Sequence, residues 1–170
     1  MKYTILVLIS IFTFNLYGQN TVVETEEGFS NMIDSYLSYS VPLISVGDLT
    51  EIKSDVILLD AREENEYIVS HIPGAVHVGY DKPKEKVMDD LDKSKTVVVY
   101  CSIGYRSEKI GERLQQKGFR NVLNLYGSIF EWVNQGNTVV SMSNEETKEI
   151  HTYDKKWGKW MTNKNYKKVY

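Results

Sequence analysis

The 170-residue sequence contains one cysteine and three prolines, and its charged residues nearly balance. A single cysteine cannot form a disulfide within the chain. There is no internal repeat and no linker rich in proline or serine, so we expect one domain of ordinary size. The formal net charge of −3 argues against a protein whose main partner is a nucleic acid.

The first 18 residues have the features of an export signal. Lys2 supplies a positive charge, residues 5–14 form an apolar run, and Gly18 offers a small residue for cleavage. The run is short for a membrane span, although an uncleaved N-terminal membrane anchor is the alternative. No cysteine lies near the cleavage site, which excludes lipid attachment there. We therefore expect an exported protein, periplasmic or secreted, whose mature chain starts near Gln19.

Apolar runs alternate with amphipathic segments over most of the chain. The strand candidates are continuous apolar or β-branched runs, typical of strands buried on both faces, and lie at residues 55–61, 75–79, 95–101 and 121–127. The helix candidates have apolar residues at helical spacing and lie at residues 28–39, 62–71, 84–92 and 128–136, with a short one from Gly47 and another from the loop after Cys101 to Gly118. Alternating strands and helices predict an α/β fold with a parallel sheet covered on both faces.

Cys101 stands at the carboxyl end of a predicted strand, where open parallel sheets bind their ligands. The next helix follows closely, so the loop must bend sharply, and Gly104 gives the backbone that freedom. Such a loop turns several N–H groups toward one point, next to the positive end of the helix dipole. Arg106 adds a permanent charge with forked donors. These features predict a lowered pKa and a nucleophilic thiol, and the alternative is a buried, inert cysteine with Arg106 in water.

Two motifs resemble one family. The segment LLDAREENEYIVSHIPGAVHV (58–78) resembles the first signature of the rhodanese-like sulfurtransferases, with its Asp-x-Arg, its Glu-Tyr and its His-Ile-Pro-Gly-Ala. The segment YCSIGYRS (100–107) is similar to the active loop of that family, with Cys first, Gly fourth and Arg sixth. The resemblance runs from about Ile44 to Gly136.

The resemblance implies a central five-stranded parallel sheet with helices on both faces, and chemistry without a metal or organic cofactor. It implies that Cys101 carries sulfane sulfur as a persulfide and that Arg106 orients an anionic donor such as thiosulfate. Tyr105 could also form a wall of the pocket or only cover the loop. Related phosphatases of this fold have five residues between Cys and Arg, whereas this loop has four, which favours sulfur over a phosphoryl group. The residues whose backbone amides would hold the persulfide are Ser102, Ile103, Gly104, Tyr105 and Ser107.

The first motif also supplies residues near the site. Asp60, Arg62, Glu66 and His71 are expected to be mainly scaffolding, with Arg62 pairing with Glu66 across a helical turn and His71 making a structural hydrogen bond. His77 is expected in a strand, and nothing near it in the sequence completes a metal-binding cluster.

The sequence divides into a signal peptide at 1–18, an N-terminal helical segment at 19–40, a rhodanese-like domain at 41–137 and a C-terminal extension at 138–170. Aromatic residues alternate with lysines in 151–170, a mixture that a membrane surface, a protein partner or a nucleic acid could bind. We favour aromatic rings that pack on the domain while the lysines stay in water. Export leaves nucleic acid as the least favoured partner.

Together these features predict an exported rhodanese-type sulfurtransferase, similar to thiosulfate:cyanide sulfurtransferases, that works through a Cys101 persulfide. Its partners would be a small sulfur donor, such as thiosulfate or a persulfide, and a thiol acceptor. The alternative is a non-catalytic rhodanese-like module that binds a partner, although binding alone would not require the Cys, Gly and Arg of the loop. A thiol redox partner is less favoured because a second cysteine is missing.

Overall fold

The computed structural model describes residues 26–170. The expected signal peptide and the first part of the N-terminal helical segment lie outside the described residues. No helix in the described part of the chain is long and apolar enough to cross a membrane.

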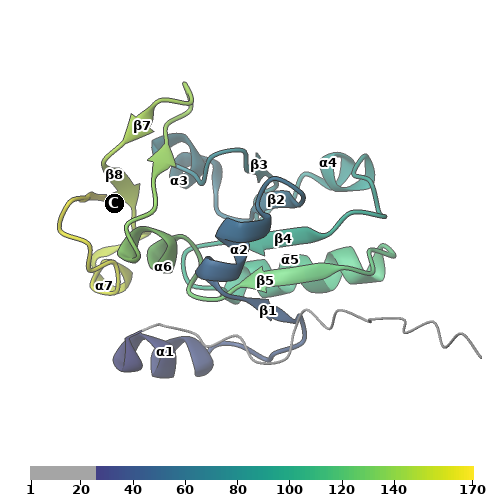
Figure 1. Cartoon of the computed structure of the whole chain (residues 1–170), viewed down its shortest axis with the longest axis horizontal. Coiled ribbons are helices and arrows are strands. Elements are labelled where there is room, and N and C mark those ends of the chain that lie inside the picture. Colours follow the sequence, from purple (N-terminus) through teal and green to yellow (C-terminus); the bar gives the residue numbers. More distant parts are fainter. Residues whose placement is uncertain (1–25) are drawn as a thin grey trace, which may run out of the picture.

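Five parallel strands form the central sheet, in the order β1-β5-β4-β2-β3 (Figure 1). They are β1 (Leu43–Ile44), β2 (Ile57–Asp60), β3 (Val76–His77), β4 (Val97–Tyr100) and β5 (Val122–Leu125). The parallel sheet predicted from the continuous apolar runs is therefore confirmed, and β1 adds an edge strand that was not among the strand candidates. His77 lies in a strand, as expected.

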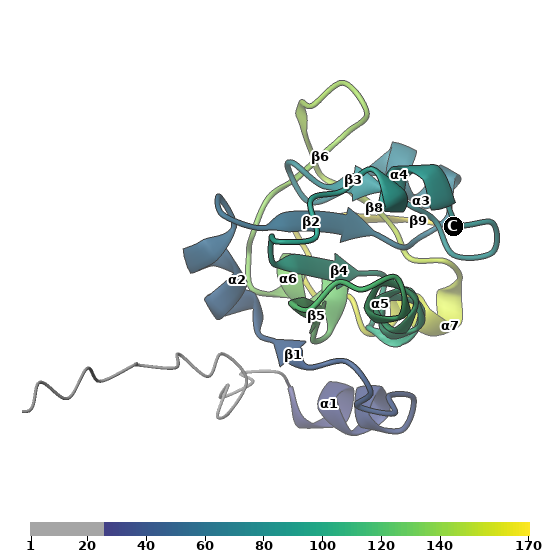
Figure 2. The same ribbon diagram turned by 90° about the vertical axis from the view of Figure 1, so that its right-hand side faces the viewer.

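Helices cover both faces of this sheet, as predicted (Figure 2). Side chains alternate along β4, so that Val98 contributes to one core cluster and Val99 to the other. The cluster around Val98 includes side chains of α1 (Glu27–Asp34), α2 (Val46–Ile52) and α6 (Ser128–Asn134). The cluster around Val99 includes side chains of α4 (Glu85–Asp89) and α5 (Tyr105–Gln116). The remaining helix of the predicted domain, α3 (Glu64–Val69), follows β2.

Helix α1 ends at Asp34, earlier than the helix predicted over residues 28–39. The backbone amides of Ser38 and Ser40 donate to the buried carboxylate of Glu108 on α5, at 2.9 and 3.1 Å. These bonds hold residues 38–40 across α5 in a non-helical course. The apolar spacing predicted a helix through residue 39, whereas residues 38–40 instead make this long-range contact with Glu108.

Apart from the exposed residues 142–146, the C-terminal extension packs on the domain. It contains β6 (Val139–Val140), β7 (Glu146–Thr147), β8 (Glu149–His151), α7 (Lys155–Gly158) and β9 (Lys167–Val169), and it lies next to α3 and α6 (Figure 1). Tyr166 is buried in the same core as α1, and Trp157 and Trp160 pack against that core. The favoured interpretation of the tail is correct for these three rings, whereas Tyr153 and Tyr170 stay exposed.

Candidate active site

The loop between β4 and α5 is short and fixed at several points. Gly104 has a φ of +124°, a conformation that side-chain-bearing residues rarely adopt. Its carbonyl oxygen accepts a hydrogen bond from Asn124 Nδ2 at 3.0 Å, and the Cys101 amide donates to Ser128 Oγ at 3.0 Å. A Cβ at Gly104 would lie 3.4 Å from Leu37, so the segment after α1 packs directly on this loop.

Cys101 lies at the bottom of the loop, with 1% of its surface exposed. The Gly104 amide donates to Sγ at 3.2 Å. Burial raises the pKa of Cys101, but the charge of Arg106 and hydrogen bonds from Ser107 and Gly104 outweigh it, so the pKa is lowered overall. The direction is the one expected from the sequence, and it favours a thiolate that can act as a nucleophile.

Arg106 binds Glu66 with both ends of its guanidinium. Nη1 donates to Oε2 at 2.6 Å and Nη2 to Oε1 at 2.8 Å, while Nη2 also donates to Ser102 Oγ at 3.0 Å. Burial alone would raise the pKa of Glu66, but the bonds and charge of Arg106 lower it overall. The Arg106 guanidinium, which was expected to orient an anionic donor, is therefore already paired with the carboxylate of Glu66.

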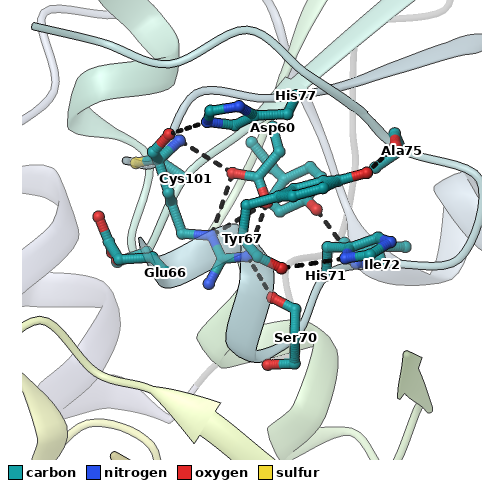
Figure 3. Close-up of polar contacts among 12 residues, drawn as sticks. Asp60, Glu66, Tyr67, Ser70, His71, Ile72, Ala75, His77 and Cys101 are labelled. Atoms are coloured by element: carbon teal, nitrogen blue, oxygen red, sulfur yellow. Dashed lines mark hydrogen bonds and ion pairs between the residues drawn. The ribbon is translucent and has the colours of Figure 1, made fainter. Parts of the chain in front are cut away.

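Arg62 does not form the expected hydrogen-bonded pair with Glu66. Its Nη2 binds Asp60 Oδ2 at 2.6 Å and the carbonyl oxygen of Ser70 at 2.6 Å, and both charged side chains are fully buried. The correction has a simple cause: α3 begins at Glu64, so Arg62 precedes the helix and cannot use the spacing of a helical turn. Figure 3 shows Cys101 and Glu66 on one side of the buried pair, with His77 next to Asp60.

The two neighbouring histidines make structural contacts. His71 Nδ1 lies 3.1 Å from the carbonyl oxygen of Tyr67, and the two rings stack at 3.9 Å (Figure 3). Burial lowers the pKa of His71, which favours the neutral ring. His77 Nε2 lies 2.8 Å from the Arg62 carbonyl oxygen. Within residues 26–170, no group of three His, Cys, Asp or Glu side chains is placed to hold a metal ion.

A cavity of about 510 Å³ opens above Cys101. Tyr105 forms part of its wall, which settles the question that the sequence left open. The N-terminal helical segment and the C-terminal extension also contribute residues to the cavity, a feature that the sequence did not suggest. The lining residues are Tyr36, Glu63, Tyr80, Asp81, Cys101, Ser102, Ile103, Tyr105, Arg106, Tyr153 and Trp157.

Three buried polar residues that support the loop were not identified from the sequence. Asn124 holds Gly104, Ser128 holds the Cys101 amide, and Glu108 holds the segment after α1. Asn124 had a detectable signal, because a polar residue within a continuous apolar strand must find a partner when buried. Ser128 and Glu108 lie on helices, where a serine or glutamate gives no such signal.

Residues 46–135 match the family model described as "Rhodanese-like domain". A Coxiella burnetii protein named thiosulfate sulfurtransferase GlpE is 34% identical over 80 residues, which are 47% of this chain and 74% of that protein. A Yersinia enterocolitica protein named tRNA uridine(34) hydroxylase is 35% identical over 83 residues, which are 46% of this chain and 24% of the hydroxylase. The solution structure of a rhodanese-like domain from Anabaena superposes with a TM-score of 0.56 at 22% identity, covering 62% of this chain and 83% of that domain, and supports the fold.

Proposed function

The chain belongs to the rhodanese-like domain family, and from this premise we propose that it is a sulfurtransferase that carries sulfane sulfur on Cys101. The observation that carries the proposal is the environment of the thiol: its pKa is lowered and the Gly104 amide points at Sγ. Hydrogen-bond donors that stabilise a thiolate would also stabilise the outer sulfur of a persulfide. The name of the Coxiella relative supports this activity, whereas the hydroxylase shows that such a region also occurs in proteins named for other reactions.

The proposed reaction has two displacement steps at Cys101. The thiolate attacks the sulfane sulfur of a donor, a new sulfur–sulfur bond forms, and the donor's own bond to that sulfur breaks. The leaving group takes the electron pair: sulfite leaves from thiosulfate, and a thiolate leaves from an organic persulfide. An acceptor thiolate or cyanide then attacks the outer sulfur and regenerates the Cys101 thiolate.

Intact mass after incubation with a sulfur donor tests this function. The full chain is treated separately with thiosulfate and with inorganic polysulfide, so that selectivity for one donor cannot hide the reaction. We expect a gain of one sulfur atom that cyanide removes as thiocyanate, and no gain in Cys101→Ser. The absence of an adduct with both donors, or an adduct that persists in Cys101→Ser, would show that the mechanism is wrong and would favour a partner-binding module.

Export is part of the proposal and rests on the sequence of residues 1–18. The test is expression of the full chain with a C-terminal tag, followed by cell fractionation and determination of the first residue. A periplasmic or secreted chain starting near Gln19 is the expected result. Full-length protein in the membrane fraction would support the uncleaved anchor, and protein in the cytoplasm would contradict export.

A further inference from the structure

Aromatic rings from both ends of the described chain meet above Cys101. Tyr36 follows α1, and Trp157 lies in α7, so both are outside the residues that match the family. The Tyr36 ring meets Trp157 edge to face at 5.3 Å and meets Tyr105, on the active-loop helix, at 6.4 Å. Tyr153, also from the C-terminal extension, lines the same cavity. We call Tyr36, Tyr153 and Trp157 the aromatic wall.

The segments that carry the aromatic wall are held in place by other contacts. Phe29 of α1 stacks on Trp160 at 5.6 Å, which joins the N-terminal segment to the C-terminal extension. Asn134 of α6 donates to the Trp160 carbonyl oxygen at 2.9 Å and accepts from the Thr162 amide at 2.8 Å. The wall is therefore preformed, which reduces the ordering cost when a ligand binds.

The charges around the cavity do not favour a small dianion. Among the described residues that line it, Arg106 is the one cation, and Glu63 and Asp81 are carboxylates. The guanidinium of Arg106 is already paired with Glu66 and lies 5.6 Å from the centre of the Tyr153 ring. A dianion would meet a neutralised cation and two carboxylates, whereas a flat apolar group would meet aromatic rings.

We propose that this cavity selects organic sulfane-sulfur donors with a flat apolar group over inorganic thiosulfate, and that the aromatic wall determines this specificity. The proposal rests on the sulfurtransferase function proposed above. The volume of about 510 Å³ suits a small organic molecule. Cys101 is 1% exposed and lines the cavity, so a small molecule that enters the cavity can reach it more readily than the surface of a folded protein can.

Two thiosulfonate anions separate the effect of the apolar group from that of charge. Benzenethiosulfonate and methanethiosulfonate each carry one negative charge and the same reacting sulfur. With either, the Cys101 thiolate bonds to the sulfane sulfur, the bond to the sulfonyl sulfur breaks, and a sulfinate leaves with the electron pair. Benzenesulfinate is also the better leaving group, so the change in the ratio of their kcat/KM values between the wild type and the wall variants, with cyanide as a common acceptor, measures what the cavity gains from the ring.

We expect the wild type to prefer benzenethiosulfonate to methanethiosulfonate by about tenfold, from contacts with several rings. Thiosulfate should have a lower kcat/KM than benzenethiosulfonate. Tyr153→Leu should lower the preference by about threefold while the value for methanethiosulfonate changes less than about twofold. Tyr36→Leu and Trp157→Leu should act in the same direction.

Tyr170→Leu is the matched control, because Tyr170 lies in the same extension and is as exposed as Tyr153, 55% against 56%, but does not line the cavity. Its preference should equal that of the wild type, and urea unfolding checks that each variant is folded. A wild-type preference near one, a preference unchanged in all three wall variants, or thiosulfate as the better donor would overturn the specificity while leaving the function intact. No persulfide with any donor would instead overturn the function.

Discussion

Arg62 and Arg106 each donate two guanidinium N–H groups to a carboxylate, Arg62 through Nε and Nη2 and Arg106 through Nη1 and Nη2, but the two pairs differ in their surroundings. The side chains of Arg62 and Asp60 are fully buried, and Arg62 also binds the Ser70 carbonyl oxygen. The Arg106 side chain is 14% exposed and borders the cavity above Cys101. The same pair of functional groups thus occurs once inside the scaffold and once at the site.

The difference in position predicts a difference in role. A fully buried charge left without its partner has no access to water, so the Asp60–Arg62 pair should matter mainly for stability. Arg106 reaches solvent through the cavity, and its charge lowers the pKa of Cys101. The Glu66–Arg106 pair should therefore matter more for the reactivity of the thiol than for the fold.

The largest effect on stability is expected from Arg62→Met. The substitution removes the partner of a buried carboxylate and should lower the free energy of unfolding by about 3–5 kcal/mol, measured by urea denaturation. The double variant Asp60→Asn/Arg62→Met removes both charges and should recover part of this loss. A single variant as stable as the wild type would show that the buried pair is not what separates the two arginines.

Arg62 also shows how far the sequence could lead. Its spacing to Glu66 suggested a helical pair, but a residue two positions before α3 is governed by the turn after β2, which brings it to Asp60. The strands and the Cys101 loop were predictable because continuous apolar runs and a glycine turn are local signals. The aromatic wall was not, because the contact between Tyr36 and Trp157 joins segments whose sequences carry no sign of each other.

Arg106→Met should have a smaller effect on stability and a larger one on chemistry. Arg106 is partly exposed, so its removal lets water from the cavity reach Glu66, and we expect a loss of about 1–3 kcal/mol. The pKa of Cys101 should rise, which should slow its alkylation by iodoacetamide, a neutral probe of the thiolate, about tenfold or more at pH 7. The acid limb of the alkylation profile should move to higher pH.

Arg113→Met is the matched control for Arg106→Met. Arg113 lies on the same helix, α5, and also pairs with a glutamate, Glu85, but at the surface. Surface pairs contribute little, so both its urea midpoint and its alkylation profile should resemble those of the wild type. An alkylation profile for Arg106→Met that matches this control would remove the proposed link between Arg106 and the thiol.

The smallest effect is expected from Glu66→Gln, which keeps one hydrogen-bond acceptor for Arg106 and should cost about 1 kcal/mol near neutral pH. The pKa of Glu66 in the folded protein is below its ordinary value of 4.5, so the unfolded chain binds more protons between the two values. The stabilisation is complete above 4.5 and is lost as the pH falls through the folded pKa.

The lowered pKa of Glu66 gives a pH test of the Glu66–Arg106 pair. Below pH 4.5 the urea midpoint of the wild type should fall more steeply than that of Glu66→Gln, so the two curves converge. Glu85→Gln is the control: Lys117 and Arg113 lower the pKa of Glu85, but this carboxylate is exposed and screened, so its curve should follow the wild type. If the urea midpoint of Glu66→Gln instead runs parallel to that of the wild type at every pH, the Glu66 carboxylate is stabilised no more than a surface carboxylate. The contrast between the two arginine pairs would then rest on Arg62 alone.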